Sequence, residues 1–294
     1  MKLGIIGNGF VGNAIAHAFI PCMEVKIYDK DPQKSFNSLE DVVNDSDVVF
    51  ISVPTPMNTD GVIDLSIVES VFEDISNTFD NTKETVFVLK STVVPGTTRS
   101  IKEKYQNLRI VFNPEFLTER HARFDFLNQS RIVLGFESDV DAHGGNTNRN
   151  VKTLQLLYNK RFSSNNFIIT NYETAELIKY FNNLFFAVKV SFMNEMKMVC
   201  DKVEVINWRK AISGFVSDGR VGDSHLQVPG PDGKRGFGGS CFPKDINAFI
   251  KFSDSVGLDL QVLKGAWKTN LNVRPEKDWE KLTGRAITDK GEQK

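Results

Sequence analysis

One of the three cysteines lies among residues that would make its thiol reactive. Residues 233–245 read GKRGFGGSCFPKD and include Cys241, Pro243 and Lys244. A thiol reacts as its thiolate, and cysteine with a pKa of about 8.5 supplies only a few per cent of it at neutral pH. The ammonium of Lys244 and the start of a helix, where proline is common, would raise that fraction. The alternative is a structural cysteine in a loop, the commonest role of a lone cysteine.

Other polar residues could complete such a site. Lys179 and Asn183 are four residues apart in an expected helix, so they share one face, where an ammonium and an amide could hold a developing alkoxide. Asp245 could act as a base or cap a helix, and Glu115 and Glu119 follow an expected strand, where ligands meet α/β sheets. The alternatives are a solvated lysine, an asparagine between helices and a pair of surface glutamates.

A glycine pattern near the N-terminus predicts a dinucleotide site. Residues 7–12 read GNGFVG, directly after an expected strand and before an expected helix. Gly7 would allow the tight turn, Gly9 the approach of a pyrophosphate, and Gly12 close helix packing. Asp29, at the end of the second strand, would bind the adenosine ribose, which favours NAD over NADP, although two nearby lysines argue the other way. Glycines that serve only a turn, and SAM or FAD sites, are the alternatives.

A nicotinamide cofactor and a nucleophilic cysteine together predict one kind of chemistry. The thiol adds to an aldehyde, the adduct loses hydride, and a thioester forms. This route needs an oxyanion stabiliser and a water molecule with its base, for which Lys179, Asn183 and Asp245 are candidates.

The first 170 residues alternate β-branched runs with helical stretches. This pattern predicts an α/β fold with a Rossmann-like, doubly wound parallel sheet. We expect strands in KLGII, EVKIYD, DVVFISV, TVFVLK, IVFN, RIVLGF and NFIIT, with helices at 11–20, 65–78 and 148–159.

A long segment without glycine or proline follows, and it reads as one apolar helix over 172–203. We therefore expect an NAD-binding domain at 1–171, a helical central domain with the cysteine at 172–272, and a charged tail at 273–294 that frays. A further helix is expected at about 244–256. A helix this apolar usually needs a partner surface, so we also expect a homodimer built around it.

Composition limits the function classes. The 294 residues carry 36 Lys+Arg and 37 Asp+Glu, a net charge of −1 that offers no field for nucleic acid or an anionic membrane. Three scattered cysteines suit neither a disulfide framework nor a zinc site, and no metal is expected. No stretch approaches the roughly 20 apolar residues of a membrane span. The expected protein is soluble and cytoplasmic.

Seven motifs, in order, resemble the UDP-glucose/GDP-mannose dehydrogenase family. They cover residues 1 to about 255, and the ordered set is far more specific than any one of its members. The motifs are GIIGNGFVG, FISVPTPMN, KSTVVPGTT, NPEFLTE, DFLNQSRIVLG, TAELIKYFNNLF and GFGGSCFPKD.

The resemblance implies catalytic roles at matching positions. Cys241 would be the nucleophile, Lys179 and Asn183 would stabilise the oxyanion, and Glu115 would be the acid–base group of thioester hydrolysis. Asp245 with Thr92 would position the water.

The resemblance also implies two binding sets. The expected NAD contacts are Gly7, Asn8, Gly9, Phe10, Val11, Gly12, Asp29, Lys34, Val53, Pro54, Thr55, Thr92, Glu119 and Lys244. The expected substrate contacts are Glu115, Phe116, Leu117, Lys179, Asn183, Arg220, Lys234, Phe237 and Gly238. Arg220 would reach the substrate across a dimer, and Gly238 and Gly239 would leave room for the sugar nucleotide.

The implied reaction is UDP-glucose + 2 NAD + water giving UDP-glucuronate + 2 NADH. GDP-mannose or a UDP-N-acetylhexosamine is an alternative substrate. A non-catalytic NAD-binding partner of a full-length enzyme and a β-hydroxyacid dehydrogenase are the alternative functions.

Two departures from the family pattern are expected to matter. Only about 20 residues follow Asn272, too few for the C-terminal nucleotide-binding domain that family members carry. The loop before the cysteine, LQVPGPDGKRGFGG, replaces an Asn-rich stretch. Lys234 and Arg235 are candidates to bind the diphosphate there, and ordinary solvated loop charges are the alternative.

Overall fold

The chain forms two compact units, each described by itself. The computed structural model describes residues 1–137, 148–163 and 165–288. The first unit comprises Met1–Thr55 and Leu65–Lys179, and the second comprises Pro56–Asp64 and Tyr180–Lys294.

The first unit is built on a seven-stranded sheet in the order β2-β1-β3-β4-β5-β6-β7. Strands β1 to β5 are parallel, and β6 pairs antiparallel with β5 and parallel with β7. The seven strands are β1 Leu3–Ile6, β2 Val25–Tyr28, β3 Val48–Ile51, β4 Val86–Leu89, β5 Arg109–Phe112, β6 Ile132–Phe136 and β7 Phe167–Asn171.

All seven predicted strands are confirmed, and the predicted doubly wound, mostly parallel sheet is confirmed, with β6 and β7 running opposite to the other five strands. Between β5 and β6 the chain forms the short helix α5 (Ala122–Leu127), about 9 Å long.

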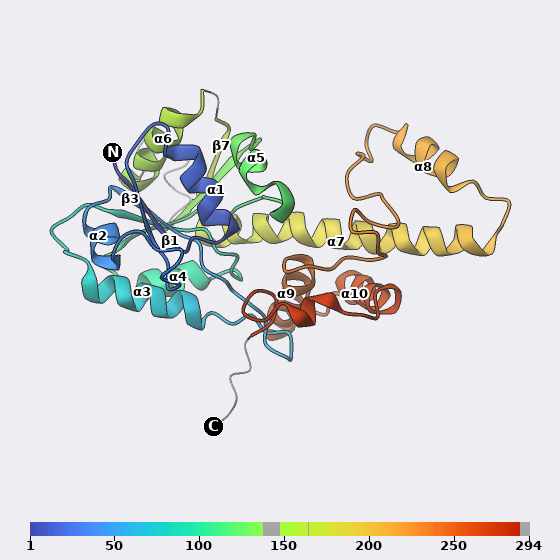
Figure 1. Cartoon of the computed structure of the whole chain (residues 1–294). Helices are drawn as coiled ribbons and strands as arrows, with labels where there is room; N and C mark the ends of the chain where they lie inside the picture. Colours follow the sequence, from blue (N-terminus) through green and yellow to red (C-terminus); the bar gives the residue numbers. More distant parts are fainter. Residues whose placement is uncertain (138–147, 164, 289–294) are drawn as a thin grey trace. The chain divides into compact units, whose positions relative to one another are not determined.

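Helices cover both faces of this sheet (Figure 1). Helices α1 (Phe10–Phe19), α5 and α6 (Arg149–Arg161) lie on one face, and α2 (Leu39–Asn44), α3 (Ser66–Thr78) and α4 (Thr97–Lys104) lie on the other. The predicted helices α1, α3 and α6 are confirmed. The sequence missed α2, α4 and α5, whose six to eight residues are too few to show a helical period.

The predicted long helix is confirmed as α7 (Tyr172–Lys202), whose 31 residues span about 46 Å. Its first eight residues belong to the first unit and the rest to the second. Tyr172 and Ala175 join the core of the sheet unit, because both are buried against it.

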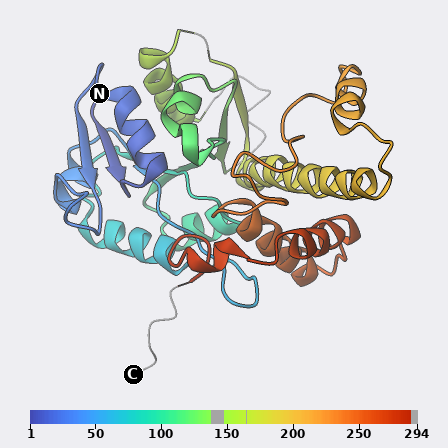
Figure 2. The same cartoon turned by 45° about the vertical axis from the view of Figure 1, so that its right-hand side comes forward.

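The described part of the second unit contains three further α-helices, α8 (Trp208–Val216), α9 (Phe242–Ser255) and α10 (Gln261–Val273). Helices α9 and α10 lie alongside the later part of α7 (Figure 2), and α8 packs on a small apolar cluster that includes Met193 of α7. The Tyr180 and Phe249 rings join α7 to α9, and Ser191 Oγ on α7 donates to Ala266 O on α10 at 2.7 Å. The predicted helix at 244–256 is confirmed as α9; α8 and α10 were not predicted.

The segment after α10 is folded, so the expectation that it frays is wrong for residues 273–288. Trp279, on the 3-10 helix η3 (Asp278–Lys281), is 2% exposed and packs with Met57 and Ala286. Met57 N donates to Ala286 O, and Thr288 N donates to Met57 O. The apolar residues among the charges fold back because they bury surface from water.

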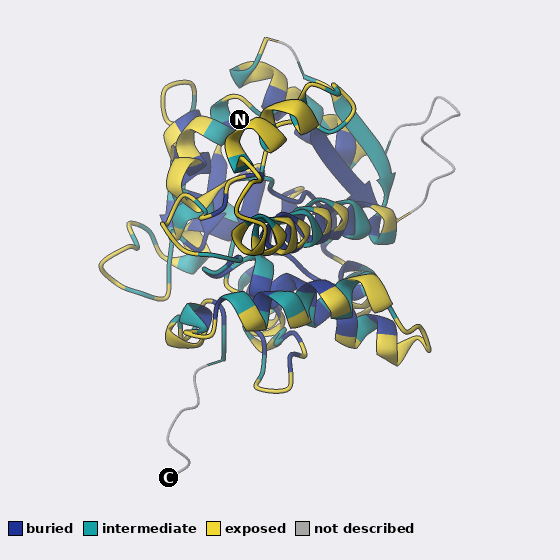
Figure 3. Ribbon diagram, turned by 90° about the vertical axis from the view of Figure 1, so that its right-hand side faces the viewer, coloured by how far each residue is buried: buried dark blue, intermediate teal, exposed yellow. Residues whose placement is uncertain are grey.

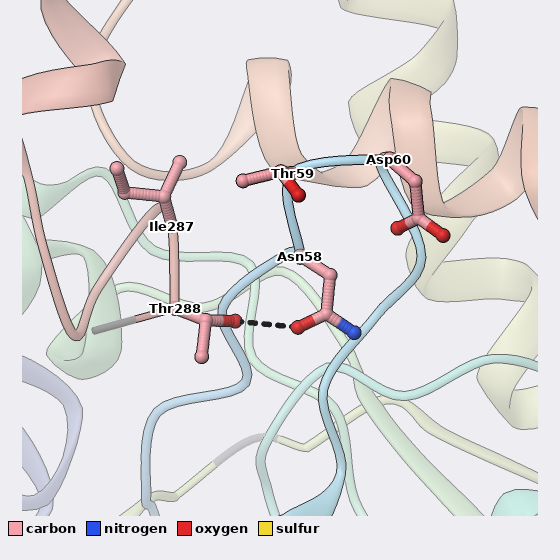
Figure 4. A pocket seen from close by; sticks show the side chains of 5 residues that line it. All are labelled: Asn58, Thr59, Asp60, Ile287 and Thr288. Carbon is pink, nitrogen blue, oxygen red and sulfur yellow. Dashed lines mark hydrogen bonds between the residues drawn. The ribbon is translucent and has the colours of Figure 1, made fainter. Parts of the chain in front are cut away.

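The contact between the Pro56–Asp64 loop and residues 286–288 frames a small open pocket (Figure 4). Its volume is about 310 Å³, and Thr288 Oγ1 donates to Asn58 Oδ1 at 2.8 Å on its wall. Thr59, Asp60 and Ile287 complete the lining.

Candidate active site

Three glycines, two in the turn between β1 and α1 and one in the first turn of α1, have different reasons to be glycine. Gly7 has a φ of 92°, and a Cβ there would lie 2.5 Å from Ser52 O. A Cβ on Gly12 would lie 2.0 Å from Gly7 O. A Cβ on Gly9 would meet nothing within 4 Å. The fold therefore requires Gly7 and Gly12, whereas Gly9 presents open backbone of the kind that a phosphate approaches.

Asp29 ties the end of β2 to this turn. Its Oδ2 accepts from Asn8 N at 2.6 Å, and its Oδ1 accepts from Asp31 N at 2.8 Å. Asn8 Nδ2 donates to Lys34 O, and Asn8 Oδ1 is buried without a hydrogen-bond partner among the described residues. A buried acceptor without a partner in the described part of the chain, Asn8 Oδ1, next to the uncovered backbone of Gly9 suits the binding of a dinucleotide, because the hydroxyl groups of a dinucleotide can donate a hydrogen bond to this oxygen. Lys34 Nζ pairs with Asp31 at 2.9 Å.

The first turn of α1 continues this site, with Phe10 and Val11 packed partly buried on the core. The loops after β3 and β4 meet at the same edge of the sheet. Val53 and Ser91 exchange two hydrogen bonds, and Thr55 Oγ1 donates to Thr92 O at 2.8 Å. Pro54 lies between Val53 and Thr55 in the sequence, and Thr92 is buried. This carboxyl edge is where open α/β sheets bind ligands.

The loop after β5 holds a buried ion pair. Lys179 Nζ on α7 lies 2.9 Å from Glu115 Oε1, and both side chains are less than 10% exposed. Glu115 Oε2 accepts from Leu117 N at 2.6 Å, and Lys179 Nζ lies 5.6 Å from the Phe116 ring centre. The structure therefore brings four predicted substrate-site residues together. Glu119, by contrast, begins the exposed 3-10 helix η1 (Glu119–His121).

A second lysine in this region was missed by sequence reasoning. Lys90, at the end of β4, is buried, and its Nζ donates to Asn113 Oδ1 at 3.0 Å and to Pro114 O at 3.4 Å. Burial lowers the pKa of Lys90 to about 7, although the charge of Glu115 acts in the opposite direction. The available signal was a lysine that closes an otherwise apolar strand in the motif KSTVVPGTT.

In the second unit, Cys241 is the N-cap of α9, and Pro243 lies in the first turn, as expected. The thiol is half-buried, with Sγ 3.8 Å from Ser240 Oγ, and none of the three cysteines forms a disulfide. The N-terminal end of a helix carries partial positive charge, and Cys241 lies at that end of α9.

A buried polar group joins α7 to this first turn of α9. Asp245 is 1% exposed, forms an ion pair with Lys244, and accepts from Asn183 Nδ2 at 2.5 Å. The amide that was predicted as an oxyanion donor thus also holds Asp245. Lys179 and Asn183 lie about one turn apart on α7. This helix therefore contributes one residue to the ion pair with Glu115 and one to the buried group around Asp245.

The basic residues predicted to bind substrate form ion pairs within the second unit. Arg220 is exposed and pairs with Asp218. Lys234 Nζ lies 3.0 Å from Glu276, and Arg235 pairs with Asp201.

The expectation that Gly238 leaves room for a substrate needs correction. A Cβ there would lie 2.4 Å from both Arg274 Nη2 and Asp278 Oδ1, so these side chains occupy that space. At Gly239 a Cβ would meet nothing within 4 Å, and the backbone is open as expected. Phe237, next to Gly238, is buried.

Within the described ranges, no group of three or more histidine, cysteine, aspartate or glutamate side chains could hold a metal ion. Among the described helices, none is long and apolar enough to cross a membrane.

Comparison with known families agrees with this fold and site. The model of the NAD-binding domain of the UDP-glucose/GDP-mannose dehydrogenase family matches residues 30–161, and the model of that family's central domain matches residues 173–272. The chain belongs to this family, which confirms the resemblance and supports NAD as the cofactor.

Similar proteins include UDP-glucose 6-dehydrogenases. One from Rickettsia typhi is 35% identical over 252 residues, which are 84% of this chain and 54% of that protein. One from Haloferax volcanii is 30% identical over 333 residues, covering 98% of this chain and 74% of that protein. The structure of a UDP-glucose dehydrogenase from Pyrobaculum islandicum superposes with a TM-score of 0.78 at 28% identity, over 92% of this chain and 68% of that one. The chain spans about half the length of the Rickettsia relative.

Proposed function

We propose that this chain is an NAD-dependent UDP-glucose 6-dehydrogenase that converts UDP-glucose to UDP-glucuronate. One observation carries the proposal: Cys241 is the N-cap of α9, and the first turn of that helix carries Lys244 and Asp245, which form a buried polar group with Asn183 of α7. A thiol placed in this way suits a covalent oxidation better than a plain alcohol oxidation, which needs no cysteine. The names of the relatives support the choice of substrate.

The overall reaction is UDP-glucose + 2 NAD⁺ + H₂O giving UDP-glucuronate + 2 NADH + 3 H⁺. NAD supplies a hydride acceptor at each of the two oxidations. In the first, the C6 alcohol loses its hydroxyl proton and a hydride and becomes an aldehyde. The open backbone at Gly9 and the acceptor at Asn8 Oδ1 support binding of this cofactor.

Cys241 then acts as the nucleophile. Its thiolate attacks the aldehyde carbon, a C–S bond forms, and the carbonyl electrons move to O6 as an alkoxide. The Lys179 ammonium and the Asn183 amide stabilise this oxyanion, and one such donor is worth about 3 kcal/mol of barrier. Loss of a second hydride from C6 restores the carbonyl as a thioester.

Hydrolysis releases the product. Asp245 and Thr92 position a water molecule, which attacks the thioester carbonyl as Glu115 accepts its proton. The C–S bond breaks, and the thiolate of Cys241 is regenerated. The buried ion pair with Lys179 supports placing Glu115 in the site, because it fixes the position of the Glu115 carboxylate.

The test is turnover with defined substrates. Purified protein is incubated with NAD and, in turn, UDP-glucose, GDP-mannose or UDP-N-acetylglucosamine, and NADH absorbance is followed. We expect two NADH per UDP-glucose, and loss of steady turnover in Cys241→Ser. Cys200→Ser, at another half-buried cysteine, is the matched control and should retain the rate.

Other outcomes identify the alternatives. A faster rate with another sugar nucleotide would reassign the substrate within the family. NAD binding without turnover on any of them would overturn the enzymatic proposal in favour of a non-catalytic NAD-binding partner.

We also propose that the chain forms a homodimer through α7. Many positions along the part of this helix in the second unit are exposed, drawn in yellow in Figure 3, and several of them carry large apolar side chains. Phe181, Phe185, Phe192, Met196 and Val199 are separated by four, seven, four and three residues, so they form one stripe. A second copy of the same stripe is the simplest cover, because twofold interfaces pair a surface with itself.

A further inference from the structure

The loop before Cys241 is held by the end of α10. Asn270 is fully buried, and its side-chain amide forms two hydrogen bonds with one backbone residue. Asn270 Oδ1 accepts from Phe237 N at 2.7 Å, and Asn270 Nδ2 donates to Phe237 O at 2.9 Å. Because both backbone groups of Phe237 are used, this side chain fixes the position of the residue and the orientation of its peptide groups.

Arg274, the C-cap residue directly after α10, holds the same loop through a buried guanidinium. It donates to Arg235 O at 3.2 Å, to Asp232 at 2.7 Å and to Asp278 at 2.6 Å. Asp278 Oδ2 in turn accepts from Gly239 N at 3.1 Å. The loop is therefore anchored on both sides of Gly238. A planar guanidinium suits this task, because it directs several donors from one rigid group.

Two glycines of this loop show how closely its backbone approaches Asn270 and Arg274. A Cβ on Gly236 would lie 2.4 Å from Asn270 Oδ1, and one on Gly238 would lie 2.4 Å from Arg274 Nη2. The backbone thus lies directly against the two side chains, and any larger residue at either glycine would push it away. Gly239, where a Cβ would meet nothing, is the point at which the loop opens.

We propose that Asn270, Arg274 and Asp278, which we call the α10 clamp, are positioning residues for the nucleophile. The clamp fixes the backbone up to Gly239, and α9 fixes it from Phe242 onward, so Ser240 and Cys241 are held between two fixed points. A thiol must meet its carbon within a few tenths of an ångström, which a loose loop does not achieve. This proposal rests on the proposed function for its catalytic part only.

Hydrogen exchange tests the anchoring without substrate or cofactor. Arg274→Met keeps an unbranched apolar chain and removes every donor. We expect amide exchange in residues 235–240 to rise tenfold or more, with that of α9 unchanged. Lys264→Met is the matched control, because Lys264 also lies on α10 and pairs with two carboxylates, but on the surface. Unchanged exchange in 235–240 would overturn the proposal.

Turnover tests the positioning. With UDP-glucose we expect Arg274→Met to lower kcat tenfold or more and to leave the Kd for NAD, measured by calorimetry, unchanged. Arg274→Lys, which keeps the charge but not the fork, should recover part of the rate. If exchange rises while kcat stays unchanged, the clamp is only structural and the proposal fails.

Asp278→Ala is a second variant, which tests the proposal if Arg274→Met does not fold. Asp278 is partly exposed, and its loss removes the acceptor of Gly239 N directly. It should raise exchange and lower kcat as Arg274→Met does. If the wild-type protein shows no turnover with any sugar nucleotide, the proposed function fails, and exchange still decides whether the clamp anchors the loop.

Discussion

In the GNGFVG motif, the fold requires glycine at two positions and does not require it at the third. The fold places backbone oxygens against Gly7 and Gly12 and nothing against Gly9. Gly9 also has an ordinary φ of −76°, which alanine adopts readily. One motif therefore contains two structural glycines and one whose small size has no structural explanation among the described residues.

Gly9→Ala should leave stability nearly unchanged and weaken NAD binding tenfold or more, because the methyl group would meet the pyrophosphate. Gly12→Ala should instead lower the free energy of unfolding by roughly 3 kcal/mol through overpacking. Calorimetric Tm and NAD titration distinguish the two. A large drop of Tm in Gly9→Ala, or full NAD affinity in the same variant, would contradict this assignment.

Lys90 is a second residue with a measurable signature. Its folded pKa of about 7 lies below the unfolded value of about 10.4, so the unfolded chain binds more protons between these pH values. Stability should therefore rise with pH in this window, by up to about 1.4 kcal/mol per pH unit. Lys90→Met should lack the rise. Urea unfolding of the wild type and of Lys90→Met at pH 7 and pH 9 measures this rise. An equal change in the free energy of unfolding in the two proteins would refute a buried amine with a lowered pKa.

At the scale of elements, α7 is fastened to α4 by one carboxylate. Glu176 is buried and accepts from Gly96 N at 2.6 Å and from Thr98 N at 2.8 Å, at the start of α4. Burial raises its pKa to about 7, against the effect of these hydrogen bonds. The link satisfies helix N–H groups that have no partner within their own helix.

The raised pKa of Glu176 predicts the opposite pH dependence to that of Lys90. The folded protein binds more protons than the unfolded chain between about pH 4.5 and 7, so stability should fall as pH rises through this window. The free energy of unfolding should fall by about 3 kcal/mol in total across this window. Glu176→Gln should remove that fall, as measured by urea unfolding at pH 5 and pH 7. Glu173→Gln is the control, because the bond to Arg99 holds the pKa of Glu173 below its ordinary value.

The elements also show how far the sequence could predict this protein. Apolar β-branched runs predicted all seven strands that the structure describes, and the absence of glycine and proline predicted α7 almost to the residue. Helices α2, α4 and α5 were missed because their six to eight residues carry no clear period. Helices α8 and α10 were missed as well. In the site, local motifs placed Cys241 and the glycine turn. Contacts such as Asn183 with Asp245, 62 residues apart, depend on tertiary packing, as does the α10 clamp.

At the scale of the whole molecule, the α7 stripe predicts the oligomeric state. Phe185→Asp places a charge in the centre of the proposed twofold interface, where burial without a partner is costly. We expect the wild type to sediment as a dimer and this variant as a monomer at micromolar concentration. Leu156→Asp, at an exposed apolar residue on α6, is the control and should remain dimeric. A monomeric wild type would refute the dimer.

The boundary between the two units falls inside α7, between Lys179 and Tyr180. A continuous helix fixes the axial spacing of its residues, at about 6 Å for four positions. Lys179 and Asn183 therefore keep a constant axial separation, which is set by the backbone of α7 and not by the packing of side chains around it.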